Sequence, residues 1–225
     1  MSKTVCITVL AQLAALIASS ASAELIIEQL ERKTVARVIA WGAPIVEDID
    51  ERSSAEAGVF TGDVSAAVDY EVHASQQSVV TVGESDVHVS GAVAVDIVRE
   101  EPGLYGTGSA YSYVRLRVVP TEEYRVDIDV RDFATSGEAA WIRAMVFDET
   151  GDPSIIYISG DDGDQTASIE LEPLRVYTIQ VYAGANHQSS LAVEGAASGI
   201  CELSIVPDGP VATETTSWSV VKSLF

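Results

Sequence analysis

Apolar and polar residues alternate with a period of two along residues 110–130, A-Y-S-Y-V-R-L-R-V-V-P-T-E-E-Y-R-V-D-I-D-V. Before Pro120, valine and leucine alternate with tyrosine and arginine; after it, valine and isoleucine alternate with arginine and aspartate. Successive side chains of a β-strand point to opposite faces of a sheet, so each half offers an apolar row to a core and a polar row to water. The pattern predicts two half-buried strands.

The same alternation recurs along most of the chain after residue 23. The longest predicted strand covers residues 64–74 and is interrupted by the polar residues 75–78, whereas the acidic and serine-rich stretch 44–57 has no period and is expected to be a loop. Residues 24–33 alone admit a helical alternative. Further strands are predicted over 34–41, 79–82, 87–97, 139–148, 154–158, 166–171, 176–183, 191–193 and 199–206.

Short strands separated by Gly, Pro and Asp are typical of all-β folds. About a dozen of them, with almost no helical pattern, favour a two-sheet antiparallel sandwich of the jelly-roll or Greek-key kind. A chain of this length suits one such domain, and the only later break in composition lies near Pro207 and Pro210. We expect one sandwich domain over residues 24–208.

The first 23 residues have the composition of a secretory signal peptide. Lys3 precedes an apolar run over residues 5–18, and Ala-Ser-Ala ends at residue 23. We therefore expect export and cleavage before Glu24, with the protein secreted, at the cell surface or in the periplasm. No later stretch reaches the roughly 20 apolar residues that cross a bilayer, so membrane insertion is not expected.

Residues 209–225 differ in composition from the predicted domain. They are rich in threonine and serine and end in an apolar segment between Trp218 and Phe225. Three interpretations remain open: an address or assembly tag, a strand docked on the sandwich, or a disordered tail.

The formal charge of −21 excludes some partners. Such a field repels phosphate backbones and anionic lipids, so nucleic-acid binding is not expected. Lysine is scarce beside arginine, a balance that resembles proteins of saline habitats but also fits an ordinary acidic secreted protein. Cys201 is the only cysteine after residue 23, so stability must come from the core, and we expect it to be a buried, inert thiol.

Several segments resemble uncharacterised exported β-sandwich proteins, many of which carry a PEP-type C-terminal sorting tail. They include E-R-x-x-x-A-R-V from Glu31, A-S-Q-Q-S-x-V from Ala74, S-Y-V-R-L from Ser112 and L-E-P-L-R-V-Y-T-I-Q-V-Y-A from Leu171. This chain departs from that group at its end, which has no V-P-E-P motif followed by an apolar span and a basic cluster. The resemblance implies a sandwich and export, and it implies no activity.

Tyr111, Tyr113, Arg115 and Arg117 form a candidate ligand-binding row. Aromatic faces stack on sugar rings and arginine donates to hydroxyls or carboxylates, so the row suits a polysaccharide or another surface component. The alternative is that the tyrosines cover a sheet rim and the arginines pair with Asp127 and Asp129. A tight hairpin at residues 121–123 would set Arg117 against Asp127 and Arg115 against Asp129; in a jelly roll the two strands would instead lie in opposite sheets.

Two acidic turns are candidates for calcium. Ca²⁺ prefers hard oxygen ligands, and such turns supply carboxylates beside backbone carbonyls. Asp and Gly also dominate turns for conformational reasons alone, and neither turn matches an EF-hand loop. The candidate ligands are Asp148, Asp152, Asp161, Asp162 and Asp164.

The sequence contains no nucleophile elbow, phosphate-binding glycine loop or paired metal-ligand motif. Asp127 and Asp129 share a predicted strand face, as the carboxylate pair of a jelly-roll glycosidase would, but such pairs are frequent among 34 acids. The favoured hypothesis is a non-catalytic exported sandwich that acts as a cell-surface, matrix or binding module. The alternatives are a calcium-assisted carbohydrate-binding module and, less favoured, a jelly-roll enzyme that acts on glycosides.

Overall fold

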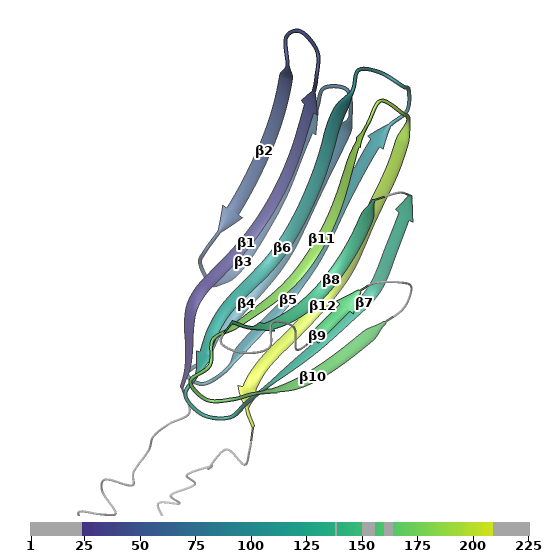
Figure 1. Cartoon of the computed structure of the whole chain (residues 1–225). Coiled ribbons are helices and arrows are strands. Elements are labelled where there is room, and N and C mark those ends of the chain that lie inside the picture. Colours follow the sequence, from purple (N-terminus) through teal and green to yellow (C-terminus); the bar gives the residue numbers. More distant parts are fainter. Residues whose placement is uncertain (1–23, 138, 150–155, 160–163, 209–225) are drawn as a thin grey trace, which may run out of the picture.

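The computed structural model describes residues 24–137, 139–149, 156–159 and 164–208, which form twelve β-strands and no helix (Figure 1). The strands are β1 (Leu25–Ala40), β2 (Val46–Ser54), β3 (Gly58–Ala67), β4 (Glu71–Val82), β5 (Val87–Arg99), β6 (Gly106–Pro120), β7 (Tyr124–Gly137), β8 (Ala140–Asp148), β9 (Ile156–Ser159), β10 (Gln165–Leu171), β11 (Tyr177–Ser189) and β12 (Val193–Pro207).

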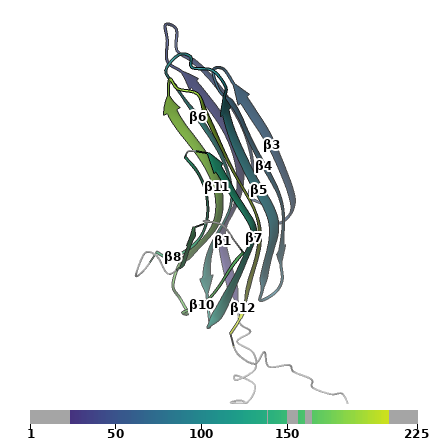
Figure 2. The same ribbon diagram turned by 90° about the vertical axis from the view of Figure 1, so that its right-hand side faces the viewer.

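The strands form two six-stranded antiparallel sheets. Sheet A has the order β2-β1-β6-β11-β8-β9, and sheet B has the order β10-β7-β12-β5-β4-β3. The sheets pack face to face, which confirms the predicted all-β sandwich. Figure 2 shows that the sandwich is bent along its strands, with sheet A on the concave side and sheet B on the convex side.

The core lies between the sheets, where the period-two rows meet. Leu116 and Val118 of β6 and Val126 and Ile128 of β7 are all at most 1% exposed, as the alternation predicts. Each aliphatic side chain buried in this way contributes about 1.5–3 kcal/mol. Cys201 also lies in the core, and burial raises the pKa of its thiol to about 12, so the prediction of a buried thiol is confirmed.

β6 and β7 do not form a hairpin. They lie in opposite sheets, and residues 121–123 cross from one sheet to the other. The predicted pairing of Arg117 with Asp127 and of Arg115 with Asp129 is therefore wrong. The alternative, in which the two strands lie in opposite sheets, is confirmed. Each of the two strands has one apolar row, and both rows are buried in the core between the sheets.

Two local predictions are also corrected. The stretch 44–57 is not a loop, because it contains β2; this edge strand is mostly exposed on both faces, which explains its lack of a period. The predicted long strand 64–74 is a hairpin of β3 and β4, with a turn closed by a 3.2 Å hydrogen bond from Val68 N to Tyr70 O.

Residues 75–78 continue β4 rather than interrupt it. Gln76 and Ser78 point into the core at 1% exposure each, and their side chains lie within hydrogen-bond distance of each other at 3.0 Å. Polar side chains can occupy a core position when they satisfy one another, so the polarity of the segment did not end the strand. Residues 25–33 belong to β1, so the helical alternative for residues 24–33 is wrong.

Candidate functional site

Four aromatic side chains gather on the outer face of sheet A. Tyr111 and Tyr113 come from β6, Tyr182 from β11 and Trp141 from β8, which are neighbours in the sheet. The ring centroid of Tyr182 lies 6.2 Å from those of Tyr111 and Tyr113 and 6.3 Å from that of Trp141. We call these four residues the aromatic platform. Within it, Tyr113 is buried and the other three residues are partly exposed.

Gly184 provides the seat for the indole of Trp141. It lies opposite both Tyr111 and Trp141 in the register, and a Cβ at this position would come within 2.8 Å of two indole carbons. The indole therefore lies directly against the backbone of β11, where any side chain would displace it. This close approach keeps Trp141 low on the sheet beside Tyr182.

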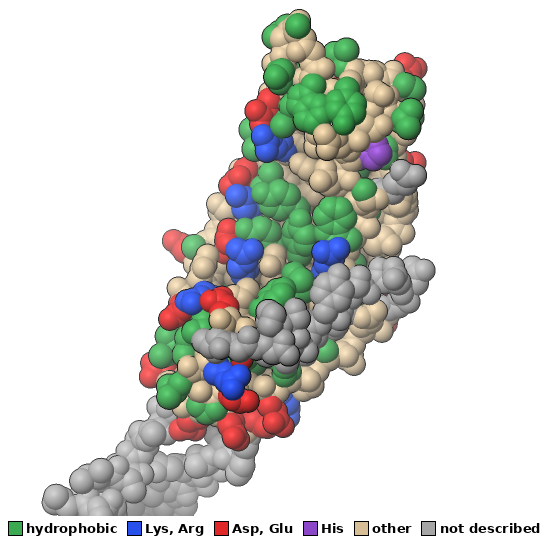
Figure 3. Space-filling model, viewed as in Figure 1, with side chains coloured by type: hydrophobic (Ala, Val, Ile, Leu, Met, Phe, Trp, Pro, Cys, Tyr) green, Lys and Arg blue, Asp and Glu red, His purple; other side chains and the backbone are tan. Residues whose placement is uncertain are grey.

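Ion pairs border the platform on the side of β1 and along β6. Arg115 contacts Glu31 at 3.3 Å, and Arg117 contacts Glu28 and Glu149, the latter at 2.9 Å. On β1, two further cations, Lys33 and Arg37, each lie 2.8 Å from a glutamate of β2, Glu51 and Glu47 respectively. Figure 3 shows the hydrophobic side chains over β6, β11 and β8 next to these basic and acidic side chains.

Two tyrosine hydroxyls of the platform, those of Tyr113 and Tyr182, have raised pKa values and are protonated at neutral pH. Burial, together with a 2.5 Å hydrogen bond to Glu31, raises the pKa of Tyr113 well above its ordinary value. Burial likewise raises the pKa of Tyr182. The Tyr113 hydroxyl already donates to Glu31, and the Arg115 guanidinium lies 5.1 Å from the Tyr113 ring centroid, so this ring anchors the platform from below.

All four predicted ligand-binding residues, Tyr111, Tyr113, Arg115 and Arg117, lie on one outward row of β6, as the alternation predicts. The two arginines do not form the predicted pairs with Asp127 and Asp129; their partners are glutamates of β1 and Glu149, which follows β8. Trp141, Tyr182 and Gly184 were missed as site residues. Their alternation was visible in the sequence, but the pairing of β11 with both β6 and β8 was not.

The predicted calcium ligands are not gathered by the described part of the chain. Asp148 is buried and accepts a 2.7 Å hydrogen bond from Arg175, and Asp164 accepts one of 3.1 Å from the backbone N–H of Asp132. Asp152, Asp161 and Asp162 lie outside the described residues. Within those residues no group of three or more His, Cys, Asp or Glu is arranged to hold a metal.

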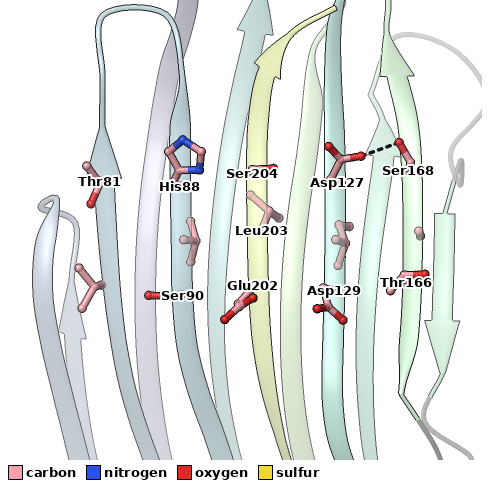
Figure 4. Close-up of a pocket in the computed structure, with 14 residues that line it drawn as sticks. Thr81, His88, Ser90, Asp127, Asp129, Thr166, Ser168, Glu202, Leu203 and Ser204 are labelled. Carbon is pink, nitrogen blue, oxygen red and sulfur yellow. Dashed lines mark hydrogen bonds between the residues drawn. The ribbon is translucent and has the colours of Figure 1, made fainter.

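The outer face of sheet B has a different character. A shallow depression of about 650 Å³ is crossed by two polar rows, one running from Thr81 to Ser168 and the other from Ser90 to Thr166 (Figure 4). The carboxylate of Asp127 accepts a 2.7 Å hydrogen bond from Ser168, which lowers the pKa of Asp127. None of the residues that line this depression is Phe, Tyr or Trp, so these residues offer no aromatic surface for stacking.

The two carboxylates in the second row are already engaged. Asp129 and Glu202 are directly opposite each other in the register, and Arg131 contacts both, at 3.4 Å and 2.5 Å. Asp127 and Asp129 do share one face, as predicted, but each is held by neighbours on that face. His73 and His88 are not opposite each other, because His73 lies opposite Asp96 in the register and His88 lies opposite Thr81.

Comparison of the chain with protein-family models gives no match, and the same holds for curated proteins. Among solved structures, a presumed secreted protein from Parabacteroides distasonis is similar over 83% of this chain and 73% of its own, with 9% sequence identity and a TM-score of 0.21. A similarity at this level does not bear on function. In the described ranges the structure has no helix long and apolar enough to span a membrane.

Proposed function

We propose that this protein is a non-catalytic, exported binding module that holds a carbohydrate on the aromatic platform. The observation that supports this proposal is the cluster of three partly exposed rings, Tyr111, Tyr182 and Trp141, on the outer face of a sheet. Aromatic residues on an outer face do not contribute to the core between the sheets. Apolar rings exposed to water are unfavourable, and their presence on this face is explained if a ligand covers them.

Carbohydrate fits the chemistry of this face better than an apolar ligand does. Sugar rings have C–H faces that stack on aromatic rings and hydroxyls that need donors and acceptors at the rim. The platform supplies the rings, and Arg115, Gln180 and Glu31 lie at its border. These side chains belong to sheet A, which lies on the concave side of the bent sandwich (Figure 2), and an extended ligand on that side can touch several of them at once.

Calcium assistance is the second candidate. The predicted ligands lie in the acidic segments of the sequence after β8 and before β10. Among the described residues, the carboxylate of Asp148 is already bound by Arg175. A calcium-dependent module would have to draw its ligands chiefly from the other predicted residues. We therefore favour binding that does not require the metal.

A glycan array, run with calcium and with a chelator, tests both candidates. The full chain is expected to bind glycans in either condition. Tyr182→Ala removes the ring that contacts the other three and is expected to weaken binding about tenfold, or about 1.4 kcal/mol. Val59→Ala is the control, because this exposed side chain lies on β3 of sheet B, away from the platform, and binding should not change.

The outcomes separate the hypotheses. Absence of glycan binding, or binding that Tyr182→Ala leaves intact, would contradict the proposed site. Binding that is lost with the chelator would favour the calcium-assisted alternative.

A further inference from the structure

We infer that the ligand is an uncharged glycan chain that lies along the β6–β11 strand pair. This inference rests on the proposed function and specifies its ligand class. It is drawn from the side chains that flank the platform on these two strands and from the ion pairs that Arg115 and Arg117 form with glutamates.

The outward side chains of β6 and β11 form six opposed pairs. Two pairs belong to the platform, and the others are Thr107–Gln188, Ser109–Asn186, Arg115–Gln180 and Arg117–Thr178. Consecutive pairs are two residues apart, which is about 6.8 Å along a strand, so the six pairs extend over roughly 34 Å. A surface of this length suits an elongated ligand rather than a single sugar.

Hydroxyl and amide groups flank the rings in both directions along the strands. Asn186 and Gln188 are exposed, and Ser109, Gln180 and Thr178 are partly exposed. Amide and hydroxyl side chains both donate and accept hydrogen bonds, as the hydroxyls of a neutral sugar do. The arrangement of aromatic rings in the middle with neutral polar groups on either side matches the alternating apolar faces and hydroxyl edges of a glycan.

The two arginines on this strip are not available to an anion. The Arg115 guanidinium faces Glu31, and Arg117 lies between Glu28 and Glu149, whose pKa is lowered by the hydrogen bonds from Arg117 and Thr178. An anionic polysaccharide would have to displace a glutamate from each arginine. It would also approach a chain with a formal charge of −21, so uncharged chains are favoured.

The test is titration calorimetry with a series of neutral oligosaccharides and one acidic oligosaccharide of the same length as the longest neutral probes. The neutral series is cellobiose, cellotetraose and cellohexaose together with xylohexaose and mannohexaose; the acidic probe is hexagalacturonate. At least one neutral hexamer is expected to bind ten times or more as tightly as hexagalacturonate, with affinity that rises with chain length. Asn186→Ala and Gln180→Ala, which lie on opposite sides of the rings and are not in the core, are each expected to weaken hexamer binding about threefold or more.

A charge variant tests whether pairing with glutamate keeps an arginine of the strip from binding an anion. Glu28→Gln with Glu149→Gln removes both acidic partners of Arg117 and is expected to increase hexagalacturonate affinity at least tenfold. Glu84→Gln with Glu100→Gln is the control; it removes the same charge from exposed residues on either side of β5 and should have a much smaller effect.

Three results would overturn the inference. If hexagalacturonate binds best and Tyr182→Ala abolishes that binding, the proposed site stands but its ligand is acidic. If a disaccharide binds as tightly as a hexamer, or if both polar variants bind normally, the ligand does not extend along the strands. If no probe binds and the glycan array is also blank, the proposed function fails together with this inference.

Discussion

Arg32 is fully buried although it carries a charge, and its hydrogen bonds explain why the fold tolerates it. Its guanidinium donates to the carbonyl oxygens of Gly58, at 2.7 Å, and of Glu56, and to the hydroxyl of Ser54 at 3.3 Å. It also lies 5.3 Å from the ring centroid of Phe60. One side chain of β1 thus ties sheet A to the segment that enters sheet B, and burial lowers its pKa.

We predict that Arg32→Met destabilises the protein by about 2–4 kcal/mol, because buried carbonyl oxygens lose their donor and each such loss costs roughly 1–3 kcal/mol. Urea denaturation measures the change in the free energy of unfolding. Arg37→Met, on the same strand but in an exposed pair with Glu47, is the control and should change stability by about 1 kcal/mol or less. Equal effects of the two substitutions would contradict the role assigned to Arg32.

At the scale of the elements, β2 protects the exposed edge of sheet B. The carboxylate of Asp48 accepts a 3.0 Å hydrogen bond from the backbone N–H of Ala67, and that of Asp50 accepts one of 3.4 Å from Ser65. Both N–H groups belong to β3, the edge strand of sheet B. Unpaired edge groups are templates for pairing with another chain, so acidic side chains that cap them oppose aggregation.

We predict that Asp48→Ala combined with Asp50→Ala promotes self-association by uncovering this edge. Size-exclusion chromatography with light scattering should show dimers and larger species that increase with protein concentration. Glu84→Ala with Glu100→Ala removes the same charge from exposed turns and should stay in the state of the unmodified protein. If both double variants associate equally, loss of charge rather than edge exposure is the cause.

At the scale of the whole molecule, both faces carry acids that are paired with arginines. On the concave face Arg115 and Arg117 contact glutamates beside the aromatic platform, and on the convex face Arg131 contacts Asp129 and Glu202. The excess of acids over the entire chain gives a formal charge of −21. Repulsion among these carboxylates opposes the compact state.

We predict that the melting temperature rises between 0.1 and 1 M NaCl, since the Debye length shortens from about 10 Å to about 3 Å. The rise should diminish as the pH falls toward the carboxylate pKa values near 4, because the charge that salt screens is then lost. A melting temperature that is flat or falls with salt at neutral pH would show that self-repulsion does not limit stability.

The sequence by itself determined the direction of the side chains. In a strand, the face to which a residue points depends only on its position along the chain, so the rows of β6, β7 and β8 could be predicted and the all-β sandwich inferred from them. The same local rule placed Tyr111, Tyr113, Arg115 and Arg117 on one outward row. It failed at β2, where neither face is covered, and at residues 75–78, where polar side chains satisfy one another in the core.

Only the tertiary structure decided which strands are neighbours. The partners of β6 are β1, far before it in sequence, and β11, far after it, and this order brings Tyr182 and Trp141 to Tyr111 and sets Glu31 against Arg115. Alternation is nearly the same in every strand and so cannot specify pairing, which depends on how all the apolar rows fill one core together. The candidate site is therefore a property of sheet order, because its side chains are distant in the sequence.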